Sequence, residues 1–550
     1  RGRGSRTVGQ YLLAGKTMPW YAMALSIMAT QASAITFIST TGQSYVDGMR
    51  FVQFYFGLPI AMVILSATAV PIFHRANVYT AYQYLEQRFD AKTRALVSVI
   101  FLIQRGLAVG LALYAPAVVL TVILGWPDRW TTLAMGTLVI IYTSIGGIKA
   151  VTWTDFQQML IMIAGILTAL GVAIWLLPEG VSFPDAVALA GTAGRLNAVT
   201  FNMDWSDRYN LWSGLIGGAF LALAYFGCDQ SQVQRYLTGK SIAQSRLSLL
   251  FTAAAKVPMQ TIILFTGTMV FVFFVFVRPP LVFQPVALER VRAPEWKAEY
   301  QPLAERYDAA FEGRKQAALR LLDARRQDDP AARSARAAEY RAAEKKFEAV
   351  RREGSAFAGR VTGEPDFNDT NYIFLTFVTR YMPVGVVGLI LAAIFAAAMS
   401  TISAEVNSLA TVSVIDIYRR HFKREASDLH YLWASRAATV FWGCYAVATA
   451  EFGRNLGSLI EAVNMLGSLF YGGMLGVFVL AFFFPRVKAN GAFYGVIAGE
   501  AAIFATRFLT NVSFLWYNVI GCVVVIVTAL AISAIEAPGG TIPAAKAEGS

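Results

Sequence analysis

The sequence predicts an all-α polytopic membrane protein, and two observations carry that prediction. First, 56% of the 550 residues are hydrophobic and only 15% are charged, whereas ordinary soluble domains carry about 25% charged residues. Second, apolar runs of about 20 residues, long enough to cross a hydrocarbon core of about 30 Å, recur along the chain. The net charge of +12 does not indicate nucleic-acid binding, because the basic residues follow the loops between these runs.

The apolar runs predict twelve membrane spans. They lie at residues 18–41, 51–73, 96–124, 130–148, 155–177, 211–228, 249–277, 384–415, 431–450, 456–484, 492–507 and 514–535. Lys and Arg concentrate in alternate loops, around residues 1–16, 75–94, 149, 235–246, 419–424 and 486–488. Because cytoplasmic loops carry the excess of Lys and Arg, this pattern places both the segment 1–17 and the tail 536–550 in the cytoplasm.

A charged segment, 286–368, interrupts the membrane pattern on the opposite side. Residues 295–327 and 331–352 have helical spacing, and Asp329-Pro330 marks a turn between them. Apolar side chains recur at heptad-like spacing, at Leu303, Tyr307, Ala310, Ala317 and Leu321 and at Tyr340, Ala343, Phe347 and Val350. This predicts an extracellular helical hairpin. Its acids and bases nearly cancel, which favours a solvated spacer over a surface that docks a protein partner.

The span at 384–415 carries hydroxyl groups and ends in basic residues, in the string AAIFAAAMSTISAEVNSLATVSVIDIYRR. Ala397, Ser400 and Thr401 are spaced i, i+3 and i+4, so two hydroxyls and one backbone carbonyl share a helical face. Such neutral oxygens are the ligands that a hard cation accepts inside a bilayer. The alternative is that the hydroxyls bond back to the preceding turn, as is common in membrane helices.

The first span carries polar residues at mid-membrane depth. Thr30, Gln31, Ser33 and Thr36 fall within AMALSIMATQASAITFIST, at a depth where polar groups are costly and usually functional. Transporter helices that break at the midplane expose carbonyls to ions, whereas small polar residues also serve helix packing. The residues alone leave both interpretations open.

Arg105 lies about 10 residues into the span at 96–124, roughly 15 Å deep at about 1.5 Å per residue. That depth is too great for the side chain to reach the interface comfortably. The neighbouring spans supply few acids, so we expect the guanidinium to lack an acidic protein partner. A substrate carboxylate would fit it through paired hydrogen bonds, and the alternative is a structural role against helix carbonyls.

Several strings resemble the sodium/solute symporter family, which includes carriers for sugars, proline, sialic acid, monocarboxylates, vitamins and iodide. They are the AAIFAAAMST core with its DIYRR exit, residues 29–39, CDQSQVQRYL at 228–237, and residues 462–500. The resemblance implies a five-plus-five inverted-repeat (LeuT-type) fold with repeats at 18–177 and 211–484. The hairpin interrupts the second repeat, and peripheral helices follow at 492–535. SRTVGQYLLAGKTMPW resembles the loop after the family's first helix, so we expect a further helix upstream.

The resemblance also implies a sodium site. The family's first broken helix gives two backbone carbonyls to sodium, at positions that match Ala29 and Ala32. These carbonyls join the face that Ala397, Ser400 and Thr401 present on the eighth core helix. Sodium is therefore the expected coupling ion.

The residues match the family's second sodium site only in part. In members with two sites, an Asp matching Asp155 joins serines matching Ser400 and Ser403 and a third hydroxyl. Ala404 occupies that third position here, so one ligand is missing. Asp155 fits equally well as an acid at a helix N-terminus, where the helix dipole stabilises it.

The resemblance further implies the solute contacts. Positions matching Gln31, Ser33 and Thr36 contact the substrate in sialic acid carriers, and there an Arg matching Arg105 holds the substrate carboxylate. Four aromatic candidates complete the set: Phe51, Tyr55, Tyr225 and Phe226, with Phe51 closing the outer side and Tyr225 or Phe226 the inner side. The YAPA after Arg105 is more similar to monocarboxylate and vitamin carriers.

These features predict a sodium-coupled symporter that imports a small solute across the plasma (inner) membrane. Arg105 favours an organic anion with a carboxylate, and a neutral sugar or amino acid with a structural Arg105 is the alternative. Ile35-Thr36 stands where sugar carriers place Gln and Glu, which weakens a sugar. A transporter-like membrane sensor is a further alternative. No enzymatic activity is expected, because the three histidines are scattered and no catalytic triad or phosphate loop can be assembled.

Overall fold

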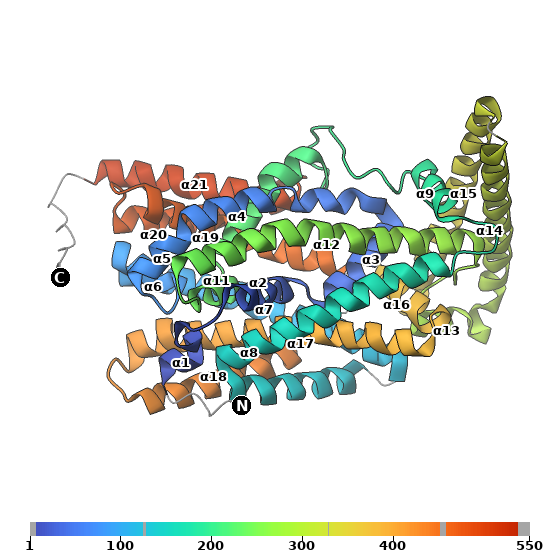
Figure 1. Ribbon diagram of the computed structural model, residues 1–550. Helices are drawn as coiled ribbons and strands as arrows, with labels where there is room; N and C mark the ends of the chain where they lie inside the picture. The colour runs from blue at the N-terminus through green and yellow to red at the C-terminus, as the bar shows by residue number, and fades with distance from the viewer. Residues whose placement is uncertain (1–6, 125–127, 328, 451–457, 537–550) are drawn as a thin grey trace.

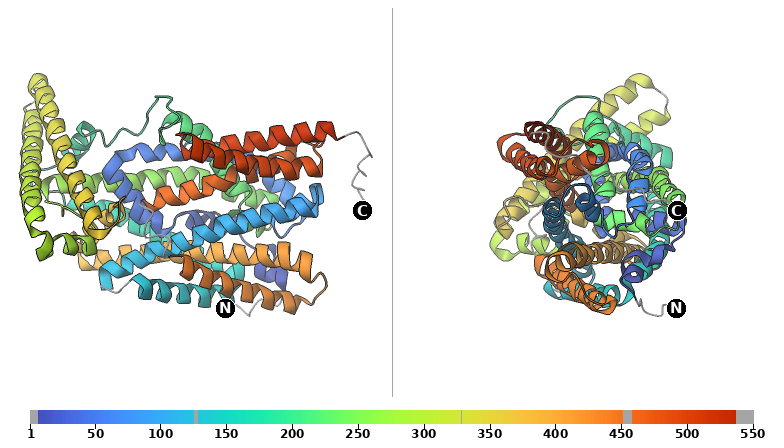
Figure 2. Two further views of the ribbon diagram at one scale, coloured as in Figure 1. Left: turned by 180° about the vertical axis from the view of Figure 1, so that it is seen from behind. Right: turned by 90° about the vertical axis from the view of Figure 1, so that its left-hand side faces the viewer.

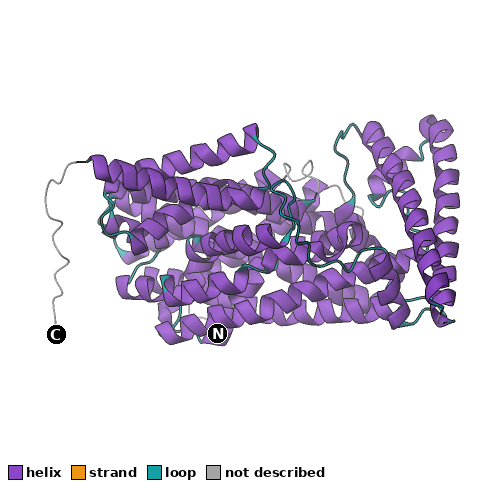
Figure 3. Cartoon of the chain, turned by 90° about the horizontal axis from the view of Figure 1, so that it is seen from above, coloured by secondary structure: helices purple, strands orange, loops and turns teal. Residues whose placement is uncertain are grey.

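The protein is a bundle of long helices that run side by side along one axis (Figures 1 and 2). The computed structural model describes residues 7–124, 128–327, 329–450 and 458–536. Within these ranges it contains helices and loops and no β-strand (Figure 3). Two further helices, α14 (Lys297–Arg326) and α15 (Pro330–Thr362), lie across one end of the bundle (Figure 1). The all-α prediction is confirmed.

Eight segments of the described residues are long and apolar enough to cross a membrane. They are Ala34–Ala76, Ala91–Leu120, Gly147–Trp175, Ile242–Phe276, Val384–Phe422, Leu459–Phe483, Ala489–Leu509 and Phe514–Ile535. The other predicted spans are helical too, but they are shorter, interrupted or more polar. They correspond to α2 (Trp20–Gln31), the first half of α8 (Asp128–Trp175), η3 (Ser213–Gly217) with α10 (Gly218–Gly227), and α18 (Asp428–Thr449).

Each of the first two predicted spans is divided into separate helices. The run at 18–41 divides into α2 and α3 (Ala34–Asp47), because Ala32 and Ser33 adopt non-helical conformations (ψ 75° and 172°). The run at 51–73 divides into η2 (Gly48–Tyr55), α4 (Leu58–Ala67) and α5 (Ala69–Ala76). Hydropathy measures only how apolar the side chains are, whereas these breaks are changes in backbone conformation, so the apolar runs do not reveal them.

Two predicted spans, 130–148 and 155–177, belong to one long element, α8, which bends at Gly147. Gly147 has φ +59°, which a residue with a Cβ rarely adopts. A Cβ would also lie 2.7 Å from the ring of Tyr11 in α1 (Val8–Leu13). The bend therefore depends on glycine, and it lets α1 pack closely against α8.

Several of the remaining helices pack around the broken pair α2 and α3. α17 (Val384–Val412) packs against α2, α7 and α8, and α12 (Ile242–Phe276) packs against α2, α3 and α4. The other bounds are α6 (Ala81–Arg88), α7 (Ala91–Leu124), α9 (Phe183–Thr192), α11 (Gln230–Leu237), α13 (Pro285–Val291), α16 (Thr370–Tyr381), α19 (Leu459–Phe483), α20 (Ala489–Leu509) and α21 (Phe514–Ile535). Short 3-10 turns η1 (Ala14–Lys16) and η4 (Pro294–Trp296) and the π-helical end η5 (Ser413–Phe422) complete the chain.

Two of the basic residues that entered the orientation argument do not lie in exposed loops. Arg94 and Arg235 are 5% and 0% exposed. Arg94 pairs with Asp416 and Glu86 at 2.6 Å, and Arg235 lies 3.8 Å from Asp155. Both are buried partners of acids. Lys240 remains an exposed loop charge, and Lys149 and Arg246 are exposed on the helices α8 and α12.

The charged segment forms the predicted hairpin. Asp329 caps α15, since its Oδ1 accepts hydrogen bonds from the amides of Ala331 (2.9 Å) and Ala332 (3.1 Å). α15 continues to Thr362, beyond the predicted end at 352, and stops at Gly363 in the left-handed conformation. The predicted heptad positions are buried, with Ala343 partly buried: Leu303, Tyr307, Ala310, Ala317, Leu321, Tyr340, Phe347 and Val350.

The hairpin is docked on the bundle, so it is not a free solvated spacer. Arg314, 1% exposed, stacks 3.6 Å above the ring of Phe347 and donates to the Phe274 carbonyl of α12 (2.5 Å). Arg195 pairs with Glu348 of α15 and donates to the Val46 carbonyl at the end of α3. These contacts bind the hairpin to α12 and to α3, the second half of the broken helix.

Replacement of Arg314 by Ala should release the hairpin. The change leaves Glu344 and the Phe274 carbonyl without the guanidinium, and breaking a buried ion pair costs about 3–5 kcal/mol. Limited proteolysis and thermal unfolding in detergent should show loss of protection confined to residues 286–368. The control is Arg320→Ala, which removes an ion pair to Glu339 whose two side chains are 55% and 33% exposed, and should cost about 0–1 kcal/mol. Equal protection in both variants would contradict the docking role of Arg314.

Candidate functional site

The break between α2 and α3 lies at the centre of the candidate site. α2 ends at Gln31, and the amide of Ala32 still donates to the Met28 carbonyl (2.8 Å). Ser33 begins α3 without a capping bond from its side chain. A helix that stops leaves the carbonyls of its last turn without intrahelical donors. One of them, the Thr30 carbonyl, accepts a hydrogen bond from the hydroxyl of Thr401 on α17 (3.1 Å).

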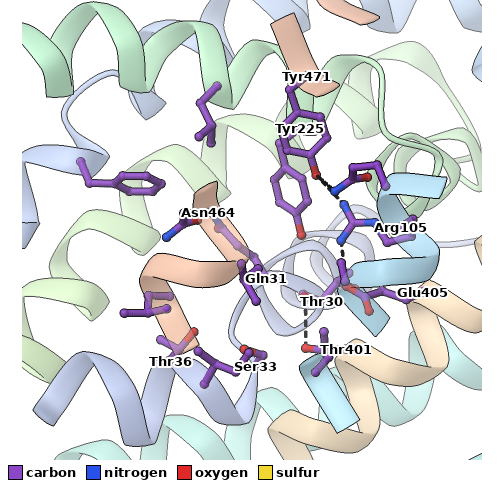
Figure 4. A pocket seen from close by; sticks show the side chains of 18 of the residues that line it. Thr30, Gln31, Ser33, Thr36, Arg105, Tyr225, Thr401, Glu405, Asn464 and Tyr471 are labelled. Carbon is purple, nitrogen blue, oxygen red and sulfur yellow. Dashed lines mark hydrogen bonds and ion pairs between the residues drawn. The ribbon is translucent and has the colours of Figure 1, made fainter. Parts of the chain in front are cut away.

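A cavity of about 90 Å³ lies beside this break (Figure 4). Its wall combines polar groups from both sides of the break with residues of η2, α7, α10, α17 and α19. Six expected solute contacts line it: Gln31, Ser33, Thr36, Tyr55, Arg105 and Tyr225. Two others, Phe51 and Phe226, pack behind the wall. Phe51 stacks on Phe54 with ring centroids 5.3 Å apart, and Phe226 contacts Tyr225 edge-on at 4.8 Å.

The expected sodium ligands lie on α17 and at the end of α2, two segments that pack against each other. Ala29 lies in the last turn of α2 and Ala32 at its end, whereas Ala397, Ser400 and Thr401 lie on α17. All five residues are at most 5% exposed. Their available ligand atoms are carbonyl and hydroxyl oxygens, a set that suits a hard cation such as sodium. The structure thus brings together two segments that are far apart in the sequence.

Asp155 lies against the same part of α17. Its carboxylate, 0% exposed, accepts hydrogen bonds from Ser400 (2.8 Å) and from Ser26 of α2 (2.6 Å). Arg235 of α11 lies 3.8 Å from it. Ser403 instead donates back to the Ser400 carbonyl (3.0 Å). The helix runs from Gly147 past Asp155, so the alternative of an acid at a helix N-terminus is wrong.

Arg105 reaches the cavity from α7 and is 3% exposed, but the expectation that it lacks an acidic partner is wrong. Its Nη1 donates to Glu405 Oε1 (2.8 Å), and its Nη2 donates to Asp229 and to the hydroxyl of Tyr471 (2.6 Å). The Tyr225 ring lies 5.5 Å from the guanidinium carbon. Only Nε of the guanidinium has no hydrogen-bond partner among the described residues. Figure 4 shows the guanidinium between Tyr471 and Glu405.

Sequence reasoning missed part of this wall. Glu405, Tyr471, Gln104 and Asn464 line the cavity, and Asp229 lies directly behind Arg105. Glu405 carried a usable signal, since an acid inside an apolar membrane run is a functional candidate by default. The others lie in no local pattern that distinguishes them from packing residues.

Residues 11–288 and 354–499 match the sodium:solute symporter family. The chain belongs to this family. It is 28% identical over 501 residues to the sodium-coupled monocarboxylate transporter 1 of Homo sapiens, with 91% of the chain and 68% of that protein covered. It is 27% identical over 501 residues to the sodium-dependent multivitamin transporter of Oryctolagus cuniculus, with 91% and 65% covered.

A sodium-coupled sialic acid symporter, solved in a substrate-bound outward-open state, shares the fold. The TM-score is 0.74 at 24% sequence identity, with 97% of the chain and 93% of that structure covered. This symporter family member therefore has the LeuT-type fold that the sequence predicted, and it is a multi-pass membrane transporter that couples solute movement to sodium. It is not an enzyme. The family match leaves out residues 289–353, which contain α14 and most of α15.

Loss of the two α17 hydroxyls should weaken sodium dependence. Ser400→Ala and Thr401→Ala each remove an oxygen that a bilayer-buried ion cannot replace with water, and each should raise the half-saturating sodium concentration at least tenfold, about 1.4 kcal/mol. The double variant should show no sodium-dependent thermal protection. Thr266→Val is the control, because that buried hydroxyl bonds only to its own helix at Ile262 (2.9 Å). Unchanged sodium activation in the double variant would refute the assignment.

A hydroxyl restored at position 404 tests the second sodium. Ala404 is 0% exposed and lies next to Ser403 on α17. Ala404→Ser should complete the oxygen set around Asp155 and move the Hill coefficient of sodium activation from about one toward two. A coefficient already near two in the unmodified symporter would show that Ala404 does not block a second ion.

Proposed function

We propose that this symporter imports a small organic anion with a carboxylate, together with sodium, across the plasma membrane, with its C-terminus in the cytoplasm. The observation that supports the proposal is the buried Arg105 guanidinium at the wall of the cavity, with Nε free of hydrogen-bond partners in the described structure. The names of the relatives agree with it, since two of them are monocarboxylate and multivitamin transporters and the structural neighbour is a sialic acid symporter.

Sodium would bind to the carbonyls of Ala29, Ala32 and Ala397 and the hydroxyls of Ser400 and Thr401. A second ion would use Asp155 and Ser403 once a hydroxyl stands in place of Ala404. The contact between these sites and the cavity runs through Thr401, which lines the cavity and also donates to the Thr30 carbonyl. Sodium bound there would stabilise one position of α17 against α2, and with it the positions of Gln31 and Ser33 that the solute meets.

Alternating access would follow from movement of the elements around the break. The aromatic cluster of Phe51, Phe54, Tyr55 and Tyr209, with ring centroids 4.9–5.9 Å apart, would close the outer side. Tyr225 and Phe226 would close the inner side. Sodium entry supplies the energy, about 2.3 kcal/mol per charge for each 100 mV of membrane potential.

A neutral solute is the second candidate, and one observation favours it. Arg105 already faces two carboxylates, Asp229 and Glu405. The guanidinium therefore does not need a substrate carboxylate to be stable in the bilayer. The neutral solute would be a sugar or an amino acid, bound by the side-chain amides of Gln31, Gln104 and Asn464 at the cavity wall.

Arg105→Lys distinguishes these candidates. Lysine keeps the charge toward Asp229 and Glu405 but loses the Nε donor that is left for the solute, so carboxylate affinity should fall at least tenfold, about 1.4 kcal/mol. Arg105→Ala should cost more, about 2–5 kcal/mol, because it also unpairs buried acids. Sodium-driven uptake of labelled carboxylates and sugars into liposomes measures both effects.

The control for folding is sodium-dependent thermal protection, which should persist in Arg105→Lys because the sodium ligands lie on α2 and α17. Arg314→Lys makes the same change at a buried arginine in the hairpin and should leave the solute affinity unchanged. A carboxylate affinity that survives in Arg105→Lys, or uptake restricted to a neutral solute, would refute the organic-anion proposal.

A further inference from the structure

We infer that Glu405 is a specificity-determining residue that accepts a hydrogen bond from a donor group next to the solute carboxylate. The solute class is then an acid with a hydroxyl or an ammonium group on the carbon beside its carboxylate. This inference rests on the proposed carboxylate transport, and it assigns the second half of the recognition to a residue outside the expected contact set.

The position of Glu405 suits this role. It lies on α17 one helical turn after Thr401, is 5% exposed, and lines the cavity beside Arg105 (Figure 4). Its Oε1 accepts from Arg105 Nη1 at 2.8 Å. Its Oε2 is buried and has no hydrogen-bond partner in the described part of the chain. A buried carboxylate oxygen without a donor is costly, so a ligand that supplies one is favoured.

Charge balance points the same way. The Arg105 cluster holds one guanidinium and two carboxylates, because Asp229 pairs with Nη2 and Glu405 with Nη1. The single negative charge of Asp229 would already neutralise the positive charge of Arg105, so the charge of Glu405 is not needed for neutrality. A surplus buried carboxylate is favourable only with a further positive or donating partner. A solute that carries a donor beside its own carboxylate provides that partner in the same place.

The amide groups at the wall cannot replace Glu405 in this discrimination. Gln31 Oε1 and Gln104 Oε1 are also buried acceptors without partners in the described structure, and Asn464 Nδ2 is an unpaired donor group. An amide can turn to present either its oxygen or its nitrogen. An ionised carboxylate accepts only. Glu405 therefore imposes a donor on the solute, whereas the amides adapt to what is bound.

Matched acids test the inference on the purified full chain in saturating sodium. Propionate, lactate and alanine share a carboxylate and a three-carbon chain, and differ only in the hydrogen, hydroxyl or ammonium on the adjacent carbon. Hexanoate, 2-hydroxyhexanoate and norleucine repeat the comparison in a longer chain. In at least one chain length, the donor-bearing acids should bind at least about tenfold more tightly than the plain acid.

Glu405→Gln should then reduce this preference. Binding of the ammonium acid should weaken at least about tenfold, because the charge partner is lost. The hydroxy acid should weaken less, because the glutamine carbonyl still accepts, and the plain acid should change less than twofold. Glu500→Gln is the matched control, since it makes the same change at a partly buried acid of α20 whose carboxylate oxygens are buried, and α20 contributes no residue to the cavity wall. Asp229 keeps Arg105 paired in both variants.

Three results would overturn the inference. The first is equal binding of the plain and donor-bearing acids, which leaves carboxylate transport standing. The second is a Glu405→Gln variant in which all three acids weaken equally or the half-saturating sodium concentration rises, which would assign Glu405 to the fold or to the cation. The third is no binding of any acid at either length, which refutes carboxylate transport itself and this inference with it.

Discussion

A helix that stops inside a packed bundle leaves the carbonyls of its last turn without intrahelical donors, and the neighbouring helices must supply partners for them. α2 stops at Gln31 in this way. On α17, the hydroxyl of Thr401 donates a hydrogen bond to the Thr30 carbonyl. On α8, the carboxylate of Asp155 accepts hydrogen bonds from Ser26 and Ser400. Polar groups of three helices therefore meet around the end of α2, beside the cavity and the proposed sodium ligands.

Buried charges around this centre are paired across distant helices. Arg105 of α7 meets Asp229 before α11 and Glu405 of α17, and Asp155 of α8 meets Arg235 of α11. α17 carries Ser400 and Thr401 of the proposed cation site and also Thr401 and Glu405 of the cavity wall, within about two turns. A displacement of α17 relative to α2 would change both sites together. This shared helix gives a physical basis for coupling between ion and solute.

Most of the hairpin lies outside the part of the chain that matches the symporter family, yet it is joined to the helix bundle. Arg195 connects α15 to the Val46 carbonyl at the end of α3, and Arg314 connects α14 to α12. In each contact, an arginine guanidinium donates a hydrogen bond to a backbone carbonyl of a core helix. The hairpin is therefore held by hydrogen bonds to helix carbonyls at the bundle end where α3 terminates.

Local patterns in the sequence determined much of this protein. Apolar run lengths gave the membrane helices, heptad spacing gave the buried side of the hairpin, and the i, i+3, i+4 spacing put Ser400 and Thr401 on one face. These features follow from covalent geometry and helical period, so neighbouring residues suffice to read them. The family resemblance placed most of the cavity contacts, including Gln31, Ser33, Thr36 and Arg105.

Only the tertiary structure decided where helices break and which charges meet. The non-helical Ala32 and Ser33 and the bend at Gly147 are backbone conformations that hydropathy does not report. The acids that face Arg105 are 124 and 300 positions away in the chain. A buried charge in a bilayer is stable only beside its partner, and which residues become partners depends on how α7, α11 and α17 pack, not on their local sequence.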